Sequence, residues 1–380
     1  MPCSAIVKSG ESSRFYHPFR RVFLFFSAGL PTSLKKVVSL PKIYIMMNGA
    51  KAIFPVLISC LFLFCVSSVT AQEVSKAGYK SITEDNARVF VGELAKDFYE
   101  GRDAGTEGAG KAAEYIISLL EKWGVEPYSK DGYLQHFRTV KNQNNWATEA
   151  DIKIDKFIAE GCENRIMKNI LACIPGEGEG YVVVGAHYDH LGIDSALVDD
   201  ICFNGADDNA SGVSAVLQLA KAMKKSKVRP KRTVIFAFWD GEEKGLLGSS
   251  FFVKRFFDVS KISAYMNFDM VGRGPQEKPL LLSYNYSAKN PLFGEWLKAD
   301  VEKYKISLEP VYNASEYLIG GSDNTPFARK KVPVVWYTTE GHPDYHRPSD
   351  SAEKINYAKL ADITRVAYLC LWRLANEESY

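Results

Sequence analysis

Acidic and imidazole side chains gather between Tyr181 and Gly248 in a pattern that could bind a metal. They are His187 and Asp189 in HYDH, Asp207 and Asp208 in NGADDNASG, and Glu242 and Glu243 in DGEEKGLLGS. Carboxylates held close together repel one another and lose hydration, so a cation is needed to neutralise them. Zinc and other divalent transition metals accept both imidazole and carboxylate ligands. The stretch therefore predicts a metal site with mixed histidine and carboxylate ligands.

Two short apolar runs must position these side chains. Tyr181–Gly185 and Thr233–Trp239 are rich in valine and other strand-forming residues, which is typical of buried strands. Histidines or acids follow each run closely. Because ligands bind beyond the carboxyl ends of strands in an open α/β sheet, both runs are expected to face one crevice.

The histidines are few and clustered. The sequence has His17, His136, His187, His190, His342 and His346, and four of them lie in HYDH and EGHPDYH. Two clusters that each follow an apolar run favour metal binding over a structural role. His187 and Asp189 face the same way on an extended chain. Asp189 is therefore either a ligand or the carboxylate that holds the imidazole of His187 in place.

The acidic pairs also have plainer interpretations. NGADDNASG could be an Asp/Asn turn that caps a helix, although two adjacent acids exceed what a cap needs and one could bridge cations. Glu242 and Glu243 could be a solvated pair at a helix start. Since consecutive side chains diverge, one could instead bind metal while the other faces substrate.

The remaining pattern predicts an α/β fold. Helices are expected at Ser81–Phe98, Gly110–Trp123, Ser211–Lys225, Pro291–Tyr304 and Tyr357–Ala375. Further strands are expected at Val125–Val140, Ala150–Ile154, Lys168–Pro175, Ser263–Met270 and Val332–Tyr337. The alternation predicts a single domain over residues 72–380, with helices on both faces of a mixed, mostly parallel sheet. Loops such as Gly272–Asn324 are expected to shape the pocket.

Residues 1–71 differ from the rest. Ile53–Val69 is an apolar run that is followed by small residues. It is shorter than a membrane-spanning helix, which needs about 20 apolar residues. This predicts a signal peptide cleaved after Ala71, not a membrane anchor. Met46 stands where such a signal would begin, so Met1–Ile45 is expected to be an over-long gene start. The mature chain is thus expected to be periplasmic or secreted, without stable membrane anchoring.

The net charge and the cysteines limit which partners, metal sites and disulfides can be expected. A net charge of +2 gives no reason to expect a nucleic-acid partner. Cys162, Cys173, Cys202 and Cys370 would remain after cleavage, and they have no Cys-x-x-Cys spacing that would predict a zinc-thiolate site. One or two disulfides and buried free thiols are both compatible with this pattern.

Five ordered motifs, HxD, GADDNASG, EExGLLGS, NFDMVG and YHRPSD, resemble those of the M28 family of zinc peptidases. Bacterial aminopeptidases with two zinc ions typify this family. The likeness extends from Lys168 to the C-terminus, and more weakly from about Ile82. It implies a zinc-aminopeptidase-like fold and the metal ligands His187, Asp208, Glu243, Asp269 and His346. It also implies that Glu242 is the general base and that Asp189 orients His187.

The resemblance implies a mechanism as well. His187, Asp208 and Asp269 would hold one zinc ion, and Asp208, Glu243 and His346 the other, although cobalt or manganese would also fit. The two metals would acidify a bridging water and polarise the scissile carbonyl, while Glu242 would transfer the proton. Gly321–Phe327 resembles a family segment near the substrate that usually reads GSDH, and Asn324 replaces its histidine.

We therefore expect an exported aminopeptidase that acts on peptides. A glutaminyl-cyclase-like enzyme with one zinc is an alternative, but the complete ligand set favours hydrolysis. A carboxypeptidase is a second alternative, in which Arg273 could bind the substrate carboxylate or could simply be a surface charge. A non-catalytic binding domain is a third, although such members usually lose ligands and none is lost here.

Overall fold

The computed structural model describes residues 73–317, 319–377 and 379–380. All described residues belong to one compact unit. The predicted signal peptide, its cleavage site and the over-long gene start lie outside the described residues. Within the described ranges, no helix is both long and apolar enough to cross a membrane.

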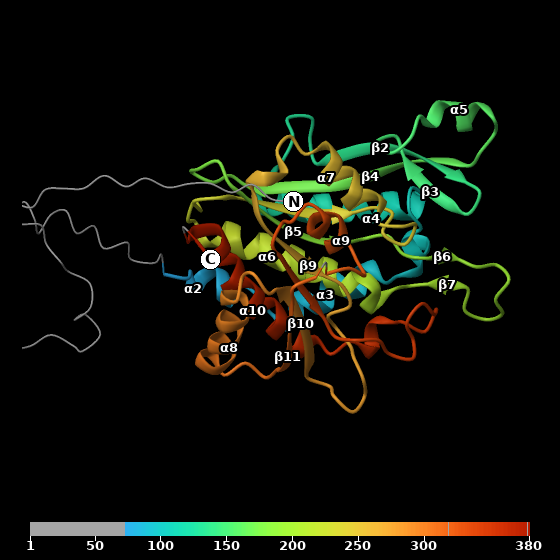
Figure 1. The fold of residues 1–380 in the computed structure, drawn as a ribbon. Helices are drawn as coiled ribbons and strands as arrows, with labels where there is room; N and C mark the ends of the chain where they lie inside the picture. Colours follow the sequence, from blue (N-terminus) through green and yellow to red (C-terminus); the bar gives the residue numbers. More distant parts are fainter. Residues whose placement is uncertain (1–72, 318, 378) are drawn as a thin grey trace, which may run out of the picture. The chain divides into compact units, whose positions relative to one another are not determined.

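A large mixed sheet forms the centre of the described part of the chain (Figure 1). Its strands lie in the order β11 (Glu309–Ser315), β10 (Leu281–Ser287), β12 (Val334–Thr338), β9 (Ile262–Phe268), β5 (Tyr181–His187), β8 (Thr233–Trp239), β4 (Asn164–Ile174), β2 (Leu134–Asn142) and β3 (Asn145–Thr148). The short strand β1 (Glu126–Pro127) also pairs with β4. Strands β6 (Gly192–Ile193) and β7 (Cys202–Phe203) form a separate antiparallel pair.

The central strands β12, β9, β5 and β8 are parallel to one another. The register places His187 of β5 opposite Trp239 of β8, and Gly185 opposite Asn267 of β9. The carboxyl ends of β5, β8 and β9 therefore meet at one edge. The predicted mixed sheet is confirmed, but it is not mostly parallel. Parallel pairing occurs in this centre and between β10 and β11, whereas the other pairs of the large sheet are antiparallel.

Helices cover both faces of the sheet. They are α2 (Lys76–Lys80), α3 (Glu84–Leu94), α4 (Glu107–Trp123), α5 (Ile154–Ala159), α6 (Gly212–Ser226), α7 (Leu247–Arg255), α8 (Leu292–Tyr304), α9 (Asn324–Arg329) and α10 (Tyr357–Asn376). Alternate residues of β5 face opposite sides. Val182 and Val184 belong to a core cluster with α3, α4, α6 and α10, whereas Val183 packs in another cluster with Phe252 of α7 and Phe327 of α9.

Capping residues explain the helix ends. Helix α4 begins after Thr106, three residues before the predicted Gly110, because the Thr106 side chain accepts the N–H of Ala109. It ends at Trp123 as predicted, and Gly124 follows in the left-handed conformation. The predicted start of the first long helix at Ser81 is wrong. Thr83 caps α3 instead, and the helix ends at Leu94 before a set of irregular turns.

Three other predictions are corrected. Ala150–Ile154 is not a strand, because the Asp151 carboxylate accepts hydrogen bonds from Thr148 and closes a turn after β3. Val125–Val140 is interrupted between β1 and β2. Gly272–Asn324 is not a loop, since it contains β10, α8 and β11.

The four cysteines among the described residues are free. Cys162 is half-buried, while Cys173, Cys202 and Cys370 are buried. The sequence was compatible with both disulfides and free thiols, and the structure has free thiols at these four positions.

Candidate metal centre

The carboxyl edge of the parallel strands brings the predicted ligands together. His187 is the last residue of β5, Glu243 lies in the turn after β8, and Asp269 follows β9 directly. Asp208 lies in the turn η3 (Ala206–Ser211) that leads into α6, and His346 lies in the segment after β12. Residues far apart in the sequence therefore meet in one place.

Asp208 directs its two carboxylate oxygens toward two different histidines. Its Oδ1 lies 3.4 Å from His187 Nε2, and its Oδ2 lies 3.1 Å from His346 Nε2. His187 Nε2 is also 3.5 Å from Asp269 Oδ1, and His346 Nε2 is 3.4 Å from Glu243 Oε2. The five residues thus form two sets that share Asp208.

The separations within these sets are those expected between ligands of a tetrahedral metal ion. Zinc binds histidine nitrogen and carboxylate oxygen at about 2.0–2.2 Å, which places neighbouring ligand atoms about 3.3–3.5 Å apart. One ligand atom each from His187, Asp208 and Asp269 lies within 4.8 Å of the others. His187 and Asp208 are almost fully buried, so uncompensated charge there would be costly. The donor atoms and their spacing fit zinc.

The neighbours of Asp208 in NGADDNASG hold it against the end of β9. Asn209 Nδ2 donates to the carbonyl of Phe268 at 2.9 Å, and Asn209 Oδ1 accepts the N–H of Met270 at 3.3 Å. These two partners flank Asp269, so Asn209 fixes one ligand segment relative to the other. Similar bonds join Asp207 Oδ1 to the N–H of Gly272 and Ser211 Oγ to the N–H of Val271.

Asp350 of YHRPSD links the same turn to the segment that carries His346. Its Oδ2 accepts the backbone N–H groups of Asp207 at 2.9 Å and Asp208 at 3.1 Å. Asp350 is fully buried, and its backbone carbonyl also accepts the N–H of Ala206. The motif therefore joins two ligand-bearing segments, which its sequence did not reveal.

Asp189 contacts the turn that carries both glutamates. Its Oδ1 accepts the N–H of Glu242 at 3.1 Å, and its Oδ2 accepts the N–H of Glu243 at 3.3 Å. Asp189 Oδ1 lies 3.6 Å from His187 Nδ1, which is closer to the backbone oxygen of Asp189, at 3.2 Å. Asp189 therefore contacts the His187 ring through its backbone oxygen, while its carboxylate fixes the turn that carries the two glutamates.

The two glutamates lie in different electrostatic surroundings. Burial raises the pKa of Glu242 well above its ordinary value, and the nearby Asp323 and Asp269 add to the shift. Burial acts on Glu243 in the same direction, but hydrogen bonds from His190 and His346 lower its pKa to about 2. One ligand atom each of Glu242, His187 and Glu243 also lies within 4.8 Å of the others, and the same holds for His190, Asp208 and Glu243.

Two residues that the sequence did not assign also lie at this centre. His190 is fully buried, and its Nδ1 lies 2.8 Å from Glu243 Oε1. Arg102 is 1% exposed and donates to backbone carbonyls of four residues, namely Leu94, Tyr188, Asn204 and Gly205. The second histidine of HYDH was a signal for His190. Nothing in the sequence around Arg102 marked it as more than part of a Gly-rich loop.

The GSDN segment lies beside the end of β9. Ser322 Oγ accepts from Asn267 Nδ2 at 2.9 Å, and Asn324 Nδ2 donates to the carbonyl of Ile319 at 2.6 Å. Asn324, which replaces the histidine of the family pattern, therefore holds its own turn at the start of α9. Its neighbour Asp323 is fully buried, and burial raises the pKa of this carboxyl to about 7.

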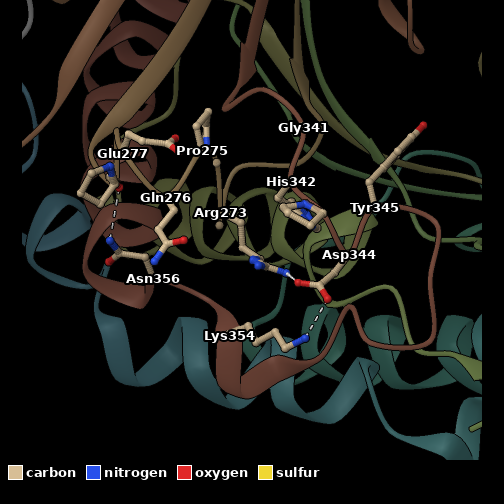
Figure 2. Close-up of a pocket in the computed structure, with 14 residues that line it drawn as sticks. Arg273, Pro275, Gln276, Glu277, Gly341, His342, Asp344, Tyr345, Lys354 and Asn356 are labelled. Carbon is tan, nitrogen blue, oxygen red and sulfur yellow. Dashed lines mark hydrogen bonds and ion pairs between the residues drawn. The ribbon is translucent and has the colours of Figure 1, made fainter.

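A pocket of about 800 Å³ opens beside the His346 segment (Figure 2). Arg273 lies in this pocket and forms an ion pair with Asp344 at 2.6 Å, which Lys354 also contacts. The side chain of Arg273 is 15% exposed, so it is a partly buried ion-pair partner and not a surface charge. Tyr345 also lines the pocket and stacks on the His346 ring, with 3.8 Å between centroids.

Known proteins that are similar to this chain include aminopeptidases. A probable leucine aminopeptidase of Trichophyton verrucosum (strain HKI 0517) is 30% identical over 59% of this chain, and the match spans 63% of the fungal protein. The structure of BSAP, a zinc aminopeptidase from Bacillus subtilis, is 19% identical with a TM-score of 0.59, covering 79% of this chain and 97% of that one. Porphyromonas gingivalis glutaminyl cyclase is 16% identical with a TM-score of 0.56, covering 76% and 97%. At these identities the solved structures support the fold.

The family resemblance is tested by a family model. The model described as peptidase family M28 matches residues 169–370. This range is more than half of the 380-residue chain and contains the motifs from HYDH to YHRPSD. The chain therefore belongs to peptidase family M28.

Proposed function

We propose that this protein is an exported zinc-dependent aminopeptidase that removes N-terminal residues from peptides. The observation that supports it most directly is the division of the two Asp208 oxygens between His187 and His346. A carboxylate placed in this way suits a bridge between two divalent ions. Family membership and the likeness to aminopeptidases support the same proposal.

In the proposed mechanism, His187, Asp208 and Asp269 would hold one zinc ion, while Asp208, Glu243 and His346 would hold the other. When bound, the pair of ions would lower the pKa of a water molecule and polarise the scissile carbonyl. Glu242 accepts the proton of the attacking water and delivers it to the leaving amine. Asp189 holds the turn that carries Glu242, because it accepts the N–H of that residue.

The reaction is tested on matched substrates with the metal counted in the same sample. A leucyl anilide, an N-acetylated leucyl anilide, a C-terminally amidated peptide and an N-terminal glutaminyl peptide would be compared. An aminopeptidase cleaves the free leucyl anilide and the amidated peptide but not the acetylated substrate, and it should contain two zinc ions per chain. Cleavage that requires a free C-terminus would instead identify a carboxypeptidase.

The glutaminyl peptide distinguishes the second candidate. The second candidate is glutaminyl cyclisation, because the fold is similar to that of Porphyromonas gingivalis glutaminyl cyclase. Ring closure with release of ammonia, no amide hydrolysis and one tightly bound zinc ion would replace the aminopeptidase proposal with a cyclase.

Export is proposed from Ile53–Val69 and the small residues before Gln72. N-terminal sequencing of protein recovered from outside the cytoplasm should give a chain that begins near Gln72. Recovery of an uncleaved chain from the membrane fraction would contradict this part of the proposal.

A further inference from the structure

The carboxylate of Glu243 is divided between two histidines in the same way as that of Asp208. Its Oε2 lies 3.4 Å from His346 Nε2, and its Oε1 lies 2.8 Å from His190 Nδ1. His346 belongs to one of the two ligand sets described above. His190 lies on the other side of the carboxylate and is fully buried.

The distances separate a hydrogen bond from shared coordination. The 2.8 Å between His190 Nδ1 and Glu243 Oε1 is a hydrogen-bond length, and it is shorter than the roughly 3.3 Å between two ligands of one zinc ion. His190 Nδ1 is also 3.8 Å from Asp208 Oδ2, whereas His346 Nε2 is 3.1 Å from that oxygen. One ligand atom each of His190, Asp208 and Glu243 lies within 4.8 Å of the others. The short distance to Glu243 and the longer one to Asp208 nevertheless fit a hydrogen-bond donor better than a metal ligand.

The other ring nitrogen of His190 supports this assignment. Nε2 is buried and has no hydrogen-bond partner among the described residues. A neutral imidazole carries one N–H, and a buried N–H requires an acceptor. The proton therefore belongs on Nδ1, where it meets Glu243.

The fold leaves the ring little room to move. A Cβ on Gly205 would lie 2.5 Å from His190 Cδ2, so this glycine allows the ring to sit against the backbone. The His190 ring packs edge-on against the His346 ring, with 5.7 Å between centroids. The backbone N–H of His190 donates to the carbonyl of Arg102 at 3.1 Å. Ring, backbone and acceptor are thus all held in place.

The geometry points to His190 as a positioning residue that holds Glu243 Oε1 so that Oε2 faces the zinc ion shared by Asp208 and His346. This inference rests on the proposed function, since it concerns one of the two proposed zinc sites. Residues that hold a ligand in this way typically contribute about 10- to 100-fold to metal affinity. The first site shares Asp208 with the second, but none of its three residues takes part in this hydrogen bond.

The test compares the whole mature protein with its His190→Asn, His190→Leu and His190→Gln variants. Asparagine carries an amide nitrogen at the same distance along the side chain as Nδ1, whereas leucine carries no donor. Glutamine places its amide near the position of Nε2, away from Glu243. The His190→Gln variant therefore replaces His190→Leu in the comparison if His190→Leu does not fold. Zinc affinity is measured at equilibrium against a coloured chelator, and the absorption spectrum is recorded after cobalt substitution.

His190→Leu and His190→Gln should weaken the second zinc ion about 10- to 100-fold and leave the first unchanged. His190→Asn should stay close to the wild-type affinity and cobalt spectrum. Wild-type affinity in His190→Leu or His190→Gln would overturn the inference. So would an equal loss in His190→Asn, or a cobalt spectrum in His190→Leu that shows one ligand fewer. If the wild-type protein itself binds fewer than two zinc ions, the proposed function fails instead.

Discussion

The carboxylate of Asp189 accepts the backbone N–H of Glu242, with 3.1 Å between Oδ1 and the nitrogen. Its second oxygen accepts the next N–H along the chain, at 3.3 Å. The acid after β5 therefore sets the conformation of the turn after β8, and with it the direction of the proposed general base. Because Asp189 is fully buried, water cannot easily replace these bonds.

We predict that Asp189→Asn lowers kcat about 10- to 100-fold while the protein keeps both zinc ions. Asparagine retains one acceptor oxygen but turns an NH₂ group toward the second N–H, so the glutamate turn loses one bond. The measurement is kcat on an aminoacyl anilide together with zinc content. Asp194→Asn, at an exposed acid in the hairpin of β6 and β7, is the matched control and should have wild-type values. Loss of zinc in Asp189→Asn would show that Asp189 acts on the ligands and not on the base.

We predict that Arg102→Met destabilises the protein by about 3 kcal/mol or more, because several buried carbonyls lose a charged donor. The Arg102 guanidinium contacts the loops on both sides of the metal centre, through the carbonyls of Tyr188 and Gly205. Urea unfolding of the metal-free protein measures the effect without any contribution from zinc binding. Arg138→Met removes an exposed arginine that pairs with Glu149, and it should cost about 1 kcal/mol at most. Equal stability of the two variants would show that Arg102 has no special role.

A third prediction concerns pH and Lys359, which donates to the carbonyls of Arg273 and Leu281. Burial lowers the pKa of this lysine from 10.5 to about 8. Between these values the unfolded chain binds more protons than the folded one, so the contribution of Lys359 to stability rises with pH. From pH 8 to pH 10 we expect wild type to gain about 2 kcal/mol relative to Lys359→Met.

Urea unfolding at the two pH values measures this difference between wild type and variant. Comparison with the variant removes the effects of other groups that titrate in the same range. Lys225→Met, at an exposed lysine in α6, should show no such trend. A constant difference between wild type and Lys359→Met would mean that Lys359 titrates as it does in the unfolded chain.

The sequence predicted the central strands of the fold and the residues that meet at their ends. Thr233–Trp239 has the predicted bounds, and Tyr181–Gly185 is extended by two residues to His187. These runs are buried on both faces, so apolar composition and strand coincide. The prediction failed at Ala150–Ile154, where an alternating pattern instead reflects an Asp151 turn and the first residue of α5. Local pattern could not distinguish the two.

The proposed ligand set followed from motif order, but the contacts that hold these residues in place did not. Asp350, Asn209 and Arg102 act through backbone groups of segments far from them in sequence. A bond from a side chain to a distant carbonyl or N–H leaves no pattern in either segment. His190 was visible as the second histidine of HYDH, yet its role depends on Glu243, which lies 53 residues away.

The last prediction separates Glu242 from Glu243, which are adjacent in sequence but differ in their surroundings. Glu243 contacts His190 and His346, whereas Glu242 lies close to His187. Glu242→Gln should keep both zinc ions and the fold, because glutamine preserves size and polarity and removes only the proton acceptor. We expect kcat to fall about 100- to 10,000-fold with little change in KM, since the loss belongs to the transition state.

Glu243→Gln provides the matched comparison one residue away. It should weaken zinc binding as well as rate, because a neutral amide is a poorer ligand than a carboxylate and loses its attraction to the cation. Kinetics on an aminoacyl anilide and zinc content should be measured for both variants at saturating zinc and after dialysis. Added zinc should restore part of the activity of Glu243→Gln but none of the activity of Glu242→Gln. Because Glu242 also lies in a potential ligand set with His187, loss of zinc from Glu242→Gln would identify it as a ligand and leave the base to be found elsewhere.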